Sequence, residues 1–332
     1  MSIKLSPGKI AGLKAVANEK GVIAAAALDQ RDLLKRMIAK VRGGEVADAE
    51  VVEFKKVVAN ALTRNASSIL LDVEYGLPAS KSINGKGLLL AYEKSGYDVR
   101  GPEKLPTLTD GWSVQRLKEA GADCVKILLF YTPFERAIFN DIKKAWVERI
   151  GAECRALDMP LFLELLAYDP HGADESGLEY AKQKPEIVRH FMEEFSKERY
   201  GADVLKLESP VQMAYVEGTR AYKGVRAYSR AEAMEIFRST ASCTDKPIVY
   251  LSAGVSHEGF IEMLELALES GVKFHGVLGG RANWQDGIPA FVKGGSTALQ
   301  QWLETTGAKN VQMVNQVLSS AAPWHSARSM QA

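Results

Sequence analysis

The sequence of 332 residues has few cysteines, and they are widely spaced without a CxxC pair: Cys124, Cys154 and Cys243. This argues against a disulfide framework or a structural zinc site. No apolar run is long enough to span a bilayer, and segment 1–21 carries charges at helical intervals instead of the apolar core of a secretory signal. These absences favour a cytoplasmic protein that does not enter a membrane.

Neither sign of charge is in excess. Lys and Arg number 42 and Asp and Glu number 41, so no overall field attracts nucleic acid or an anionic membrane surface. A GxGxxG motif is also missing after the first apolar run, so a dinucleotide-binding site has no support. We expect no nucleic-acid partner, although a local basic patch could still bind a small anionic substrate.

Short apolar runs recur along the chain, separated by longer segments with helical periodicity. Several runs are apolar on both faces, which is typical of parallel strands covered by helices. The runs span residues 21–30, 67–76, 87–93, 122–131, 160–169, 202–210, 246–254 and 274–284. Helical patterns include 48–66, 185–202 and 257–271. The alternation predicts an α/β fold of the (β/α)8 TIM-barrel class, with a doubly wound open sheet as the alternative.

We expect one domain over residues 1–332, because no interdomain linker is evident. The barrel core would cover about residues 21–294. The segment from about 295 to 332 has the pattern of one or two amphipathic helices appended to the barrel. The turn-rich segment 78–106 is expected to form a surface excursion.

Three charged residues interrupt runs that otherwise read as buried strands: Lys126, Glu164 and Lys206. Neighbouring strands lie about 4.8 Å apart, so inward side chains at one height would reach one another. Burial and a second lysine both disfavour a protonated amine, so one lysine is expected to have a lowered pKa. Such a lysine can form an imine with a ketone or aldehyde, and Glu164 could move the protons. The alternative is a structural ion pair, although two lysines around one carboxylate would leave a buried positive charge.

The predicted loops after the seventh and eighth strands form a second candidate site. In (β/α)8 barrels these loops often bind phosphate through backbone N–H groups. Glycines could expose amides at close range, and an arginine could add a charge-assisted contact. The residues concerned are Ser252, Gly254, Gly279, Gly280 and Arg281. The alternative is a pair of tight turns without a ligand.

The first two strands also end in polar residues. Asp29, Gln30 and Arg31 follow the first strand, and Asp29 could equally serve as the N-cap of the next helix. Asp72 and Glu74 follow the second strand, where helix capping or turn formation is the expected role.

Taken together, these segments resemble the class I tagatose-1,6-bisphosphate aldolase family over nearly the whole chain. The matching motifs are ALDQR (27–31), LLDVEYG (70–76), VKILLFY (125–131), FLELLAYD (162–169), VLKLESP (204–210), LSAGV (251–255) and GVLGGRANW (276–284). The resemblance implies reversible cleavage of D-tagatose 1,6-bisphosphate or a related ketohexose bisphosphate. The products would be dihydroxyacetone phosphate and glyceraldehyde 3-phosphate, formed without metal or cofactor, in a homo-oligomer such as a dimer or tetramer.

The resemblance also implies roles for individual residues. Lys206 matches the Schiff-base lysine, Glu164 the acid/base, and Lys126 a second lysine that keeps the nucleophile neutral and contacts substrate. Asp29 and Gln30 match residues near the substrate hydroxyls. The C1-phosphate site falls on Ser252, Gly254, Gly279 and Arg281. For the C6-phosphate, only Arg31 or a basic residue of the 78–106 segment can be suggested.

A zinc-dependent aldolase or isomerase on the same fold is one alternative. It would need about three His or carboxylate ligands at the carboxyl ends of the strands. The histidines do not converge there, since His275 begins the eighth strand and His190 lies in a helical segment.

Two further alternatives keep the same pocket. An aldolase for 6-deoxy-6-sulfofructose 1-phosphate would share the imine chemistry and differ where the C6 substituent binds. A non-catalytic phosphosugar sensor would bind the ligand without turnover.

Overall fold

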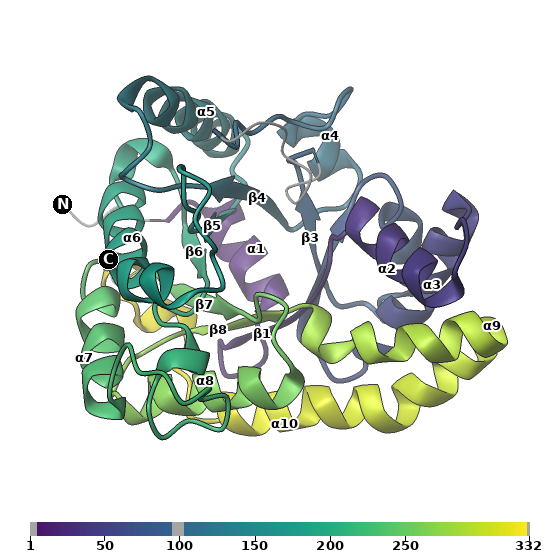
Figure 1. Ribbon diagram of the computed structural model, residues 1–332. Helices are drawn as coiled ribbons and strands as arrows, with labels where there is room; N and C mark the ends of the chain where they lie inside the picture. Colours follow the sequence, from purple (N-terminus) through teal and green to yellow (C-terminus); the bar gives the residue numbers. More distant parts are fainter. Residues whose placement is uncertain (1–4, 95–102, 331–332) are drawn as a thin grey trace.

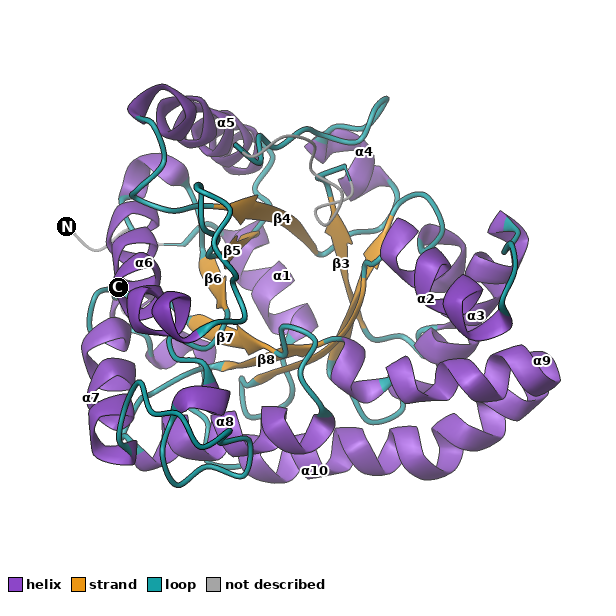
Figure 2. Ribbon diagram, in the orientation of Figure 1, coloured by secondary structure: helices purple, strands orange, loops and turns teal. Residues whose placement is uncertain are grey.

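The computed structural model describes residues 5–94 and 103–330, and its centre is a closed barrel of eight parallel strands in chain order (Figures 1 and 2). Every strand is buried along most or all of its length, which explains the unbroken apolar runs in the sequence. The strands are β1 (Ile23–Leu28), β2 (Ser68–Asp72), β3 (Gly87–Ala91), β4 (Cys124–Phe130), β5 (Leu161–Leu166), β6 (Val204–Leu207), β7 (Ile248–Leu251) and β8 (Gly276–Gly279). The predicted (β/α)8 class is confirmed, and the open-sheet alternative is wrong.

Helices surround the barrel, with apolar faces packed on the outer side chains of the strands (Figure 2). They are α2 (Asp32–Arg42), α3 (Asp48–Leu62), α4 (Val114–Glu119), α5 (Ala137–Ala156), α6 (Leu178–Phe195), α7 (Arg230–Ala241) and α8 (His257–Glu269). The connection between β2 and β3 contains a short 3-10 helix, Leu77–Ser82, in place of an α-helix. Part of the predicted 78–106 excursion, residues 95–102, lies outside the described residues.

Helix α6 differs from the pattern predicted at 185–202. It begins at Leu178 and ends at Phe195, so Pro185 lies inside it. A proline is usually found in the first turn, because it lacks the N–H that an interior position donates. Here the turns before Pro185 bury Tyr180 and Ala181, and this packing outweighs the missing hydrogen bond.

Helix α1 (Pro7–Val16) covers the end of the barrel where the strands begin, and Figure 1 shows it behind the ring of strands. Leu13 and Val16 pack there with inward side chains of the lower barrel, such as Phe162 and Val204. This end of the barrel is therefore filled by apolar groups. Ser68, at the start of β2, is a polar exception and donates a hydrogen bond of 2.8 Å to the Val16 carbonyl oxygen. Active-site groups of such barrels lie at the opposite end, where the strands finish.

The C-terminal segment adds two long helices along the outside of the barrel (Figure 1). Helix α9 (Ile288–Trp302) is kinked at Gly294 and Gly295, and a π-helical turn, Leu303–Gly307, leads into α10 (Ala308–Leu318). The predicted appended helices are confirmed. Within the described residues, no helix is long and apolar enough to cross a membrane.

Candidate active site

Strands β5 and β6 place Glu164 and Lys206 side by side inside the barrel. The two residues are direct Cα partners in the parallel ladder. Lys206 Nζ donates a hydrogen bond of 2.8 Å to Glu164 Oε2, and both side chains are buried. Below them on the same strands, Phe162 and Val204 belong to the apolar lower barrel. The charged pair thus forms the first polar layer above an apolar core.

Lys126 on β4 joins this layer and is surrounded by carboxylates. Its Nζ lies 2.8 Å from Glu164 Oε2, 2.8 Å from Asp29 Oδ2 and 2.6 Å from Glu93 Oε1. The three charged residues predicted to meet, Lys126, Glu164 and Lys206, therefore do meet. Since three carboxylates face two lysines, the expected excess of positive charge is wrong.

The ionisation of Lys126 follows from these contacts. Burial disfavours its charged form, but attraction by Asp29, Glu164 and Glu93 outweighs burial and raises the pKa of Lys126 well above its usual value. The lowered pKa expected for one of the two lysines is therefore not that of Lys126. The neighbouring carboxylates thus favour the ammonium form of Lys126.

Asp29 follows β1 and forms an ion pair with Lys126 instead of capping a helix. Helix α2 begins at Asp32, and its N-cap position is Arg31. The Asp29 carboxylate accepts hydrogen bonds from Lys126 and, at 3.3 Å, from Gln30 Nε2. Burial acts to raise the pKa of Asp29, yet the charges of Lys126 and Lys206 lower it well below its usual range. The helix-cap alternative for Asp29 is wrong.

Glu93 is a member of the cluster that the sequence reasoning did not single out. It follows β3, its side chain is buried, and burial raises its pKa despite the neighbouring Lys126 and Arg31. No described residue hydrogen-bonds its Oε2. The sequence did contain a signal for Glu93, because the third apolar run ends in this carboxylate. In barrels, functional residues lie at the carboxyl ends of the strands.

Arg31 binds the backbone at Glu93. Its Nη2 donates to the Glu93 carbonyl oxygen at 2.6 Å, and its Nη1 lies 3.4 Å from Thr109 Oγ1 and 3.7 Å from Glu74 Oε1. The Arg31 side chain is 2% exposed. At the end of β2, the Asp72 carboxylate accepts hydrogen bonds from the backbone N–H groups of residues 74–76. The turn predicted after the second strand is therefore confirmed.

A cavity at the carboxyl ends of the strands brings most of the remaining predicted residues together. It is lined by Lys206 and Glu164, and by Gln30, Ser252, Gly254, Gly280 and Arg281. Gly279, the last residue of β8, lies beside Asn283 and not in this lining. Asp29, Lys126 and Arg31 are likewise absent from the lining, so they can act on this cavity only through their neighbours.

Gly254 allows the loop after β7 to approach Arg281. Its φ is +80°, a left-handed conformation that favours glycine. A Cβ at this position would lie 2.5 Å from Arg281 Cζ. The loop is also a tight turn, in which Val255 N donates to the Ser252 carbonyl oxygen at 3.0 Å. The turn therefore holds the loop against the guanidinium, which is a suitable arrangement for an anion.

The histidines lie apart from this layer. His275 precedes β8, where its Nδ1 accepts a hydrogen bond from Ile248 N at 3.1 Å, and His190 lies on α6. Among residues 5–94 and 103–330, no group of three or more His, Cys, Asp or Glu side chains is placed to hold a metal ion.

Comparisons with known proteins place this geometry in a family. The profile of the DeoC/LacD family of aldolases matches residues 23–286. A tagatose 1,6-diphosphate aldolase of Listeria monocytogenes serotype 4a is 48% identical over 324 residues, covering 97% of this chain and 95% of the relative. A protein of the same name from Staphylococcus aureus is 48% identical over 315 residues, covering 95% of this chain and 96% of the relative.

Solved structures share the fold at low sequence identity. Fructose-bisphosphate aldolase of Plasmodium falciparum superposes with a TM-score of 0.69 at 13% identity, covering 96% of this chain and 97% of the other. A protein of Corynebacterium glutamicum gives a TM-score of 0.60 at 15% identity, covering 94% and 88%. With the family profile and the full-length relatives, the conclusion is plain: the chain belongs to the DeoC/LacD family of aldolases.

Proposed function

We propose that this protein catalyses the reversible aldol cleavage of D-tagatose 1,6-bisphosphate, and of related ketohexose bisphosphates, through a Schiff base on Lys206. The products are dihydroxyacetone phosphate and glyceraldehyde 3-phosphate. The substrate is suggested by the names of relatives that are 48% identical over nearly the whole chain. The chemistry is suggested by two lysines and a shared carboxylate at the end of a barrel where active sites occur.

The observation that carries the choice of nucleophile is the different surroundings of the two lysines. Lys126 contacts three carboxylates and has a raised pKa, which disfavours the neutral amine that attack requires. Lys206 contacts only Glu164 among the described residues and lines the cavity. Lys206 is therefore the nucleophile, and Lys126 supplies a fixed positive charge beside it.

Imine formation uses Lys206 and Glu164 together. The neutral amine attacks the C2 ketone and forms a carbinolamine. Glu164, whose Oε2 lies 2.8 Å from Lys206 Nζ, takes the proton that Lys206 loses when its amine becomes neutral. It then donates this proton to the departing hydroxyl group, and water leaves. The product is a protonated imine, whose positive charge can accept electrons from the neighbouring carbon.

Bond cleavage then proceeds with the imine as electron acceptor. Glu164, now a carboxylate, takes the proton of the C4 hydroxyl group while the C3–C4 bond breaks. Glyceraldehyde 3-phosphate leaves, and the remaining enamine is protonated at C3. Water hydrolyses the resulting imine, which releases dihydroxyacetone phosphate and restores Lys206.

The polar residues of the cavity orient the substrate in this proposal. The C1-phosphate binds between the loop of Ser252 and Gly254 and the segment Gly279–Arg281, where Arg281 supplies positive charge. Gln30 faces the sugar hydroxyl groups, and Asp29 acts on them through Gln30, from whose Nε2 it accepts a hydrogen bond. Gln30 Oε1 is buried and has no hydrogen-bond partner among the described residues, so it is available to accept from a hydroxyl group.

Borohydride trapping tests the proposal. Incubation with dihydroxyacetone phosphate and borohydride, followed by peptide mass mapping, should label Lys206 in the unaltered protein. The label should disappear in Lys206→Ala and persist in the control Lys40→Ala, whose side chain is exposed on α2. Label on Lys126 would reverse the two roles. No label in folded protein would refute the Schiff base.

The remaining parts of the proposal have their own measurements. Full activity after chelation is expected, because no metal or cofactor takes part. Faster cleavage of tagatose 1,6-bisphosphate than of 6-deoxy-6-sulfofructose 1-phosphate would support a phosphate site for C6. We also propose a cytoplasmic homo-oligomer, a dimer or tetramer, which light scattering of the purified protein would detect.

A further inference from the structure

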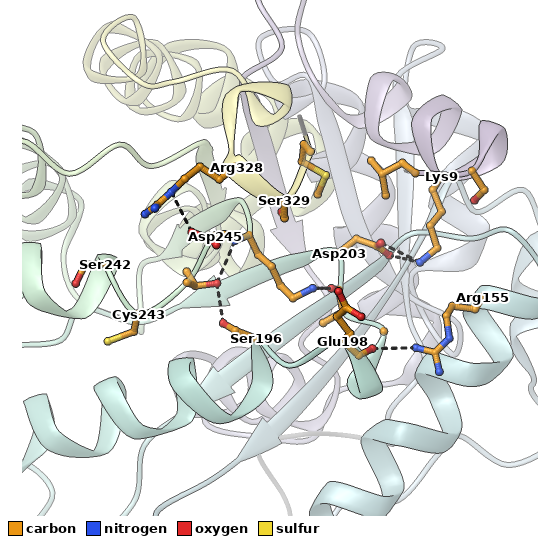
Figure 3. A pocket seen from close by; sticks show the side chains of 17 residues that line it. Lys9, Arg155, Ser196, Glu198, Asp203, Ser242, Cys243, Asp245, Arg328 and Ser329 are labelled. Atoms are coloured by element: carbon orange, nitrogen blue, oxygen red, sulfur yellow. Dashed lines mark hydrogen bonds and ion pairs between the residues drawn. The ribbon is translucent and has the colours of Figure 1, made fainter. Parts of the chain in front are cut away.

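A cavity of about 790 Å³ lies at the end of the barrel opposite Lys206, next to the starts of β6 and β7 (Figure 3). Its walls come from residues 5–9, 196–203, 242–246 and 328–330, together with Arg155 of α5. Cavities that hold small molecules commonly measure about 300–1,000 Å³. The mechanism proposed above uses none of these residues.

One pair of charges in this cavity is already balanced. Lys9 Nζ lies 2.8 Å from both carboxylate oxygens of Asp203. Asp203 Oδ2 also accepts a hydrogen bond of 2.9 Å from Leu161 N. Figure 3 shows this pair at one side of the cavity. The carboxylate of Asp203 is thus engaged by Lys9 and by the backbone of β5.

Two other cations have only neutral partners. Lys246 Nζ donates to the Ala202 carbonyl oxygen at 2.7 Å. Arg155 Nη1 donates to the carbonyl oxygens of Glu198 at 3.3 Å and of Arg199 at 3.5 Å. No carboxylate of a described residue lies within ion-pair distance of either cation. Burial lowers the pKa of Lys246, although the charges of Asp203 and Glu198 oppose this change, so a further anion would stabilise its ammonium group.

Hydroxyl groups complete the lining. Ser329 Oγ is buried, and no described residue forms a hydrogen bond with it. Ser196 and Thr244 stand on the other side, joined by a hydrogen bond of 2.6 Å. At the rim, Arg328 forms an ion pair of 3.0 Å with Asp245. The cavity therefore offers two cations that form no ion pair with a described residue and a set of hydroxyl groups, and Glu198 also belongs to its lining.

We propose that this cavity binds a small metabolite through a phosphate group held between Lys246 and Arg155. A phosphate monoester carries a charge close to −2 at neutral pH and three acceptor oxygens, which matches two cations and a nearby hydroxyl. A single carboxylate would balance only one of the cations. The site is separate from the candidate active site, because it lies where the strands begin and Lys206 lies where they end.

Equilibrium dialysis with inorganic phosphate, in a buffer free of phosphate and sulfate, tests this site. The informative variants are Lys246→Gln with Arg155→Gln, which removes the two cations, and Arg281→Gln, which alters the other cavity. Lys40→Gln, at an exposed position on α2, is the matched control for loss of charge. Glutamine at 246 can still donate to the Ala202 carbonyl oxygen, so the fold should be retained, and thermal unfolding verifies this.

The expected result is at least tenfold weaker phosphate binding at one site in the Lys246→Gln, Arg155→Gln protein. That site should be unchanged in Arg281→Gln and in Lys40→Gln. Phosphate binding that is unaltered in the double variant, or lost only in Arg281→Gln, would overturn the proposal. Borohydride labelling of Lys206 should proceed normally in the double variant. Failure of the phosphate-site proposal and failure of the proposed aldolase chemistry can therefore be distinguished.

Discussion

Glu93 Oε1 lies 2.6 Å from Lys126 Nζ, the shortest of the three carboxylate contacts to that buried amine. The two residues come from neighbouring strands, since Glu93 follows β3 and Lys126 lies within β4. This contact helps explain how a barrel interior holds two lysines. The carboxylates fix one lysine as a cation, so that the other can serve a different role.

Replacing Glu93 with glutamine tests the contribution of this contact to stability. Loss of its charge should lower the pKa of Lys126 and the free energy of unfolding, by about 1–3 kcal/mol because two carboxylates remain. Urea denaturation at pH 7 measures the change. Glu45→Gln, at an exposed position, is the control, and equal stability of the two variants would contradict the assigned role of Glu93.

Glu164→Gln should remove proton transfer while it keeps the size of the side chain. Because Glu164 is the proposed acid and base in successive steps, kcat for bisphosphate cleavage should fall by about 10²–10⁴. Steady-state kinetics on protein with a normal circular dichroism spectrum provides the measurement. A kcat within threefold of the original would show that another group moves the protons.

Gly254→Ala should disturb the loop that faces Arg281. The new Cβ would lie 2.5 Å from Arg281 Cζ, so the guanidinium must move, and KM should rise by about tenfold, as loss of about 1.4 kcal/mol of binding implies. Gly43→Ala is a matched control, since Gly43 has a φ of +74° and its added Cβ would meet nothing within 4 Å. Both variants should lose about 1–2 kcal/mol of stability from left-handed strain.

In the Gly43→Ala control, KM should not change, because Gly43 ends α2 away from the cavity. Equal KM values for the two variants would show that backbone strain, and not the approach to Arg281, accounts for any effect.

Stability should depend on pH through His275. Burial lowers the pKa of this imidazole from 6.5 to about 4. The unfolded chain therefore binds the proton first as the pH falls, so the folded state is at its most stable, with respect to this group, above pH 6.5. About 3 kcal/mol should be lost between pH 6.5 and 4.

Unfolding free energies measured across this range in the original protein and in His275→Asn provide the test. The variant should show a shallower dependence on pH, because the asparagine side chain does not titrate. His171→Asn, at an exposed position, should keep the original slope. If the free energy of unfolding depended on pH equally in all three proteins, His275 would be excluded as the source of that dependence.

The alternation of apolar runs and helical segments predicted the barrel because parallel strands are buried on both faces. Each of the eight strands lies within the run assigned to it. The start of α6 was predicted wrongly, since Pro185 has the signature of a first turn and local pattern does not reveal that Tyr180 and Ala181 are buried. Local rules miss such cases because tertiary packing overrides them.

Within the site, the residue pattern alone identified the charged residues that lie on strands, because a lysine or glutamate inside an apolar run is expected to point into a shared polar interior. Lys126, Glu164 and Lys206 could be identified in this way. The folded barrel was needed to show that Asp29 and Glu93 join them around Lys126, that Arg31 donates to the Glu93 carbonyl oxygen, and that Lys206 lines the cavity. These relationships depend on how strands distant in the chain are placed around a closed barrel, and charge balance in a buried cluster is set by neighbours in space.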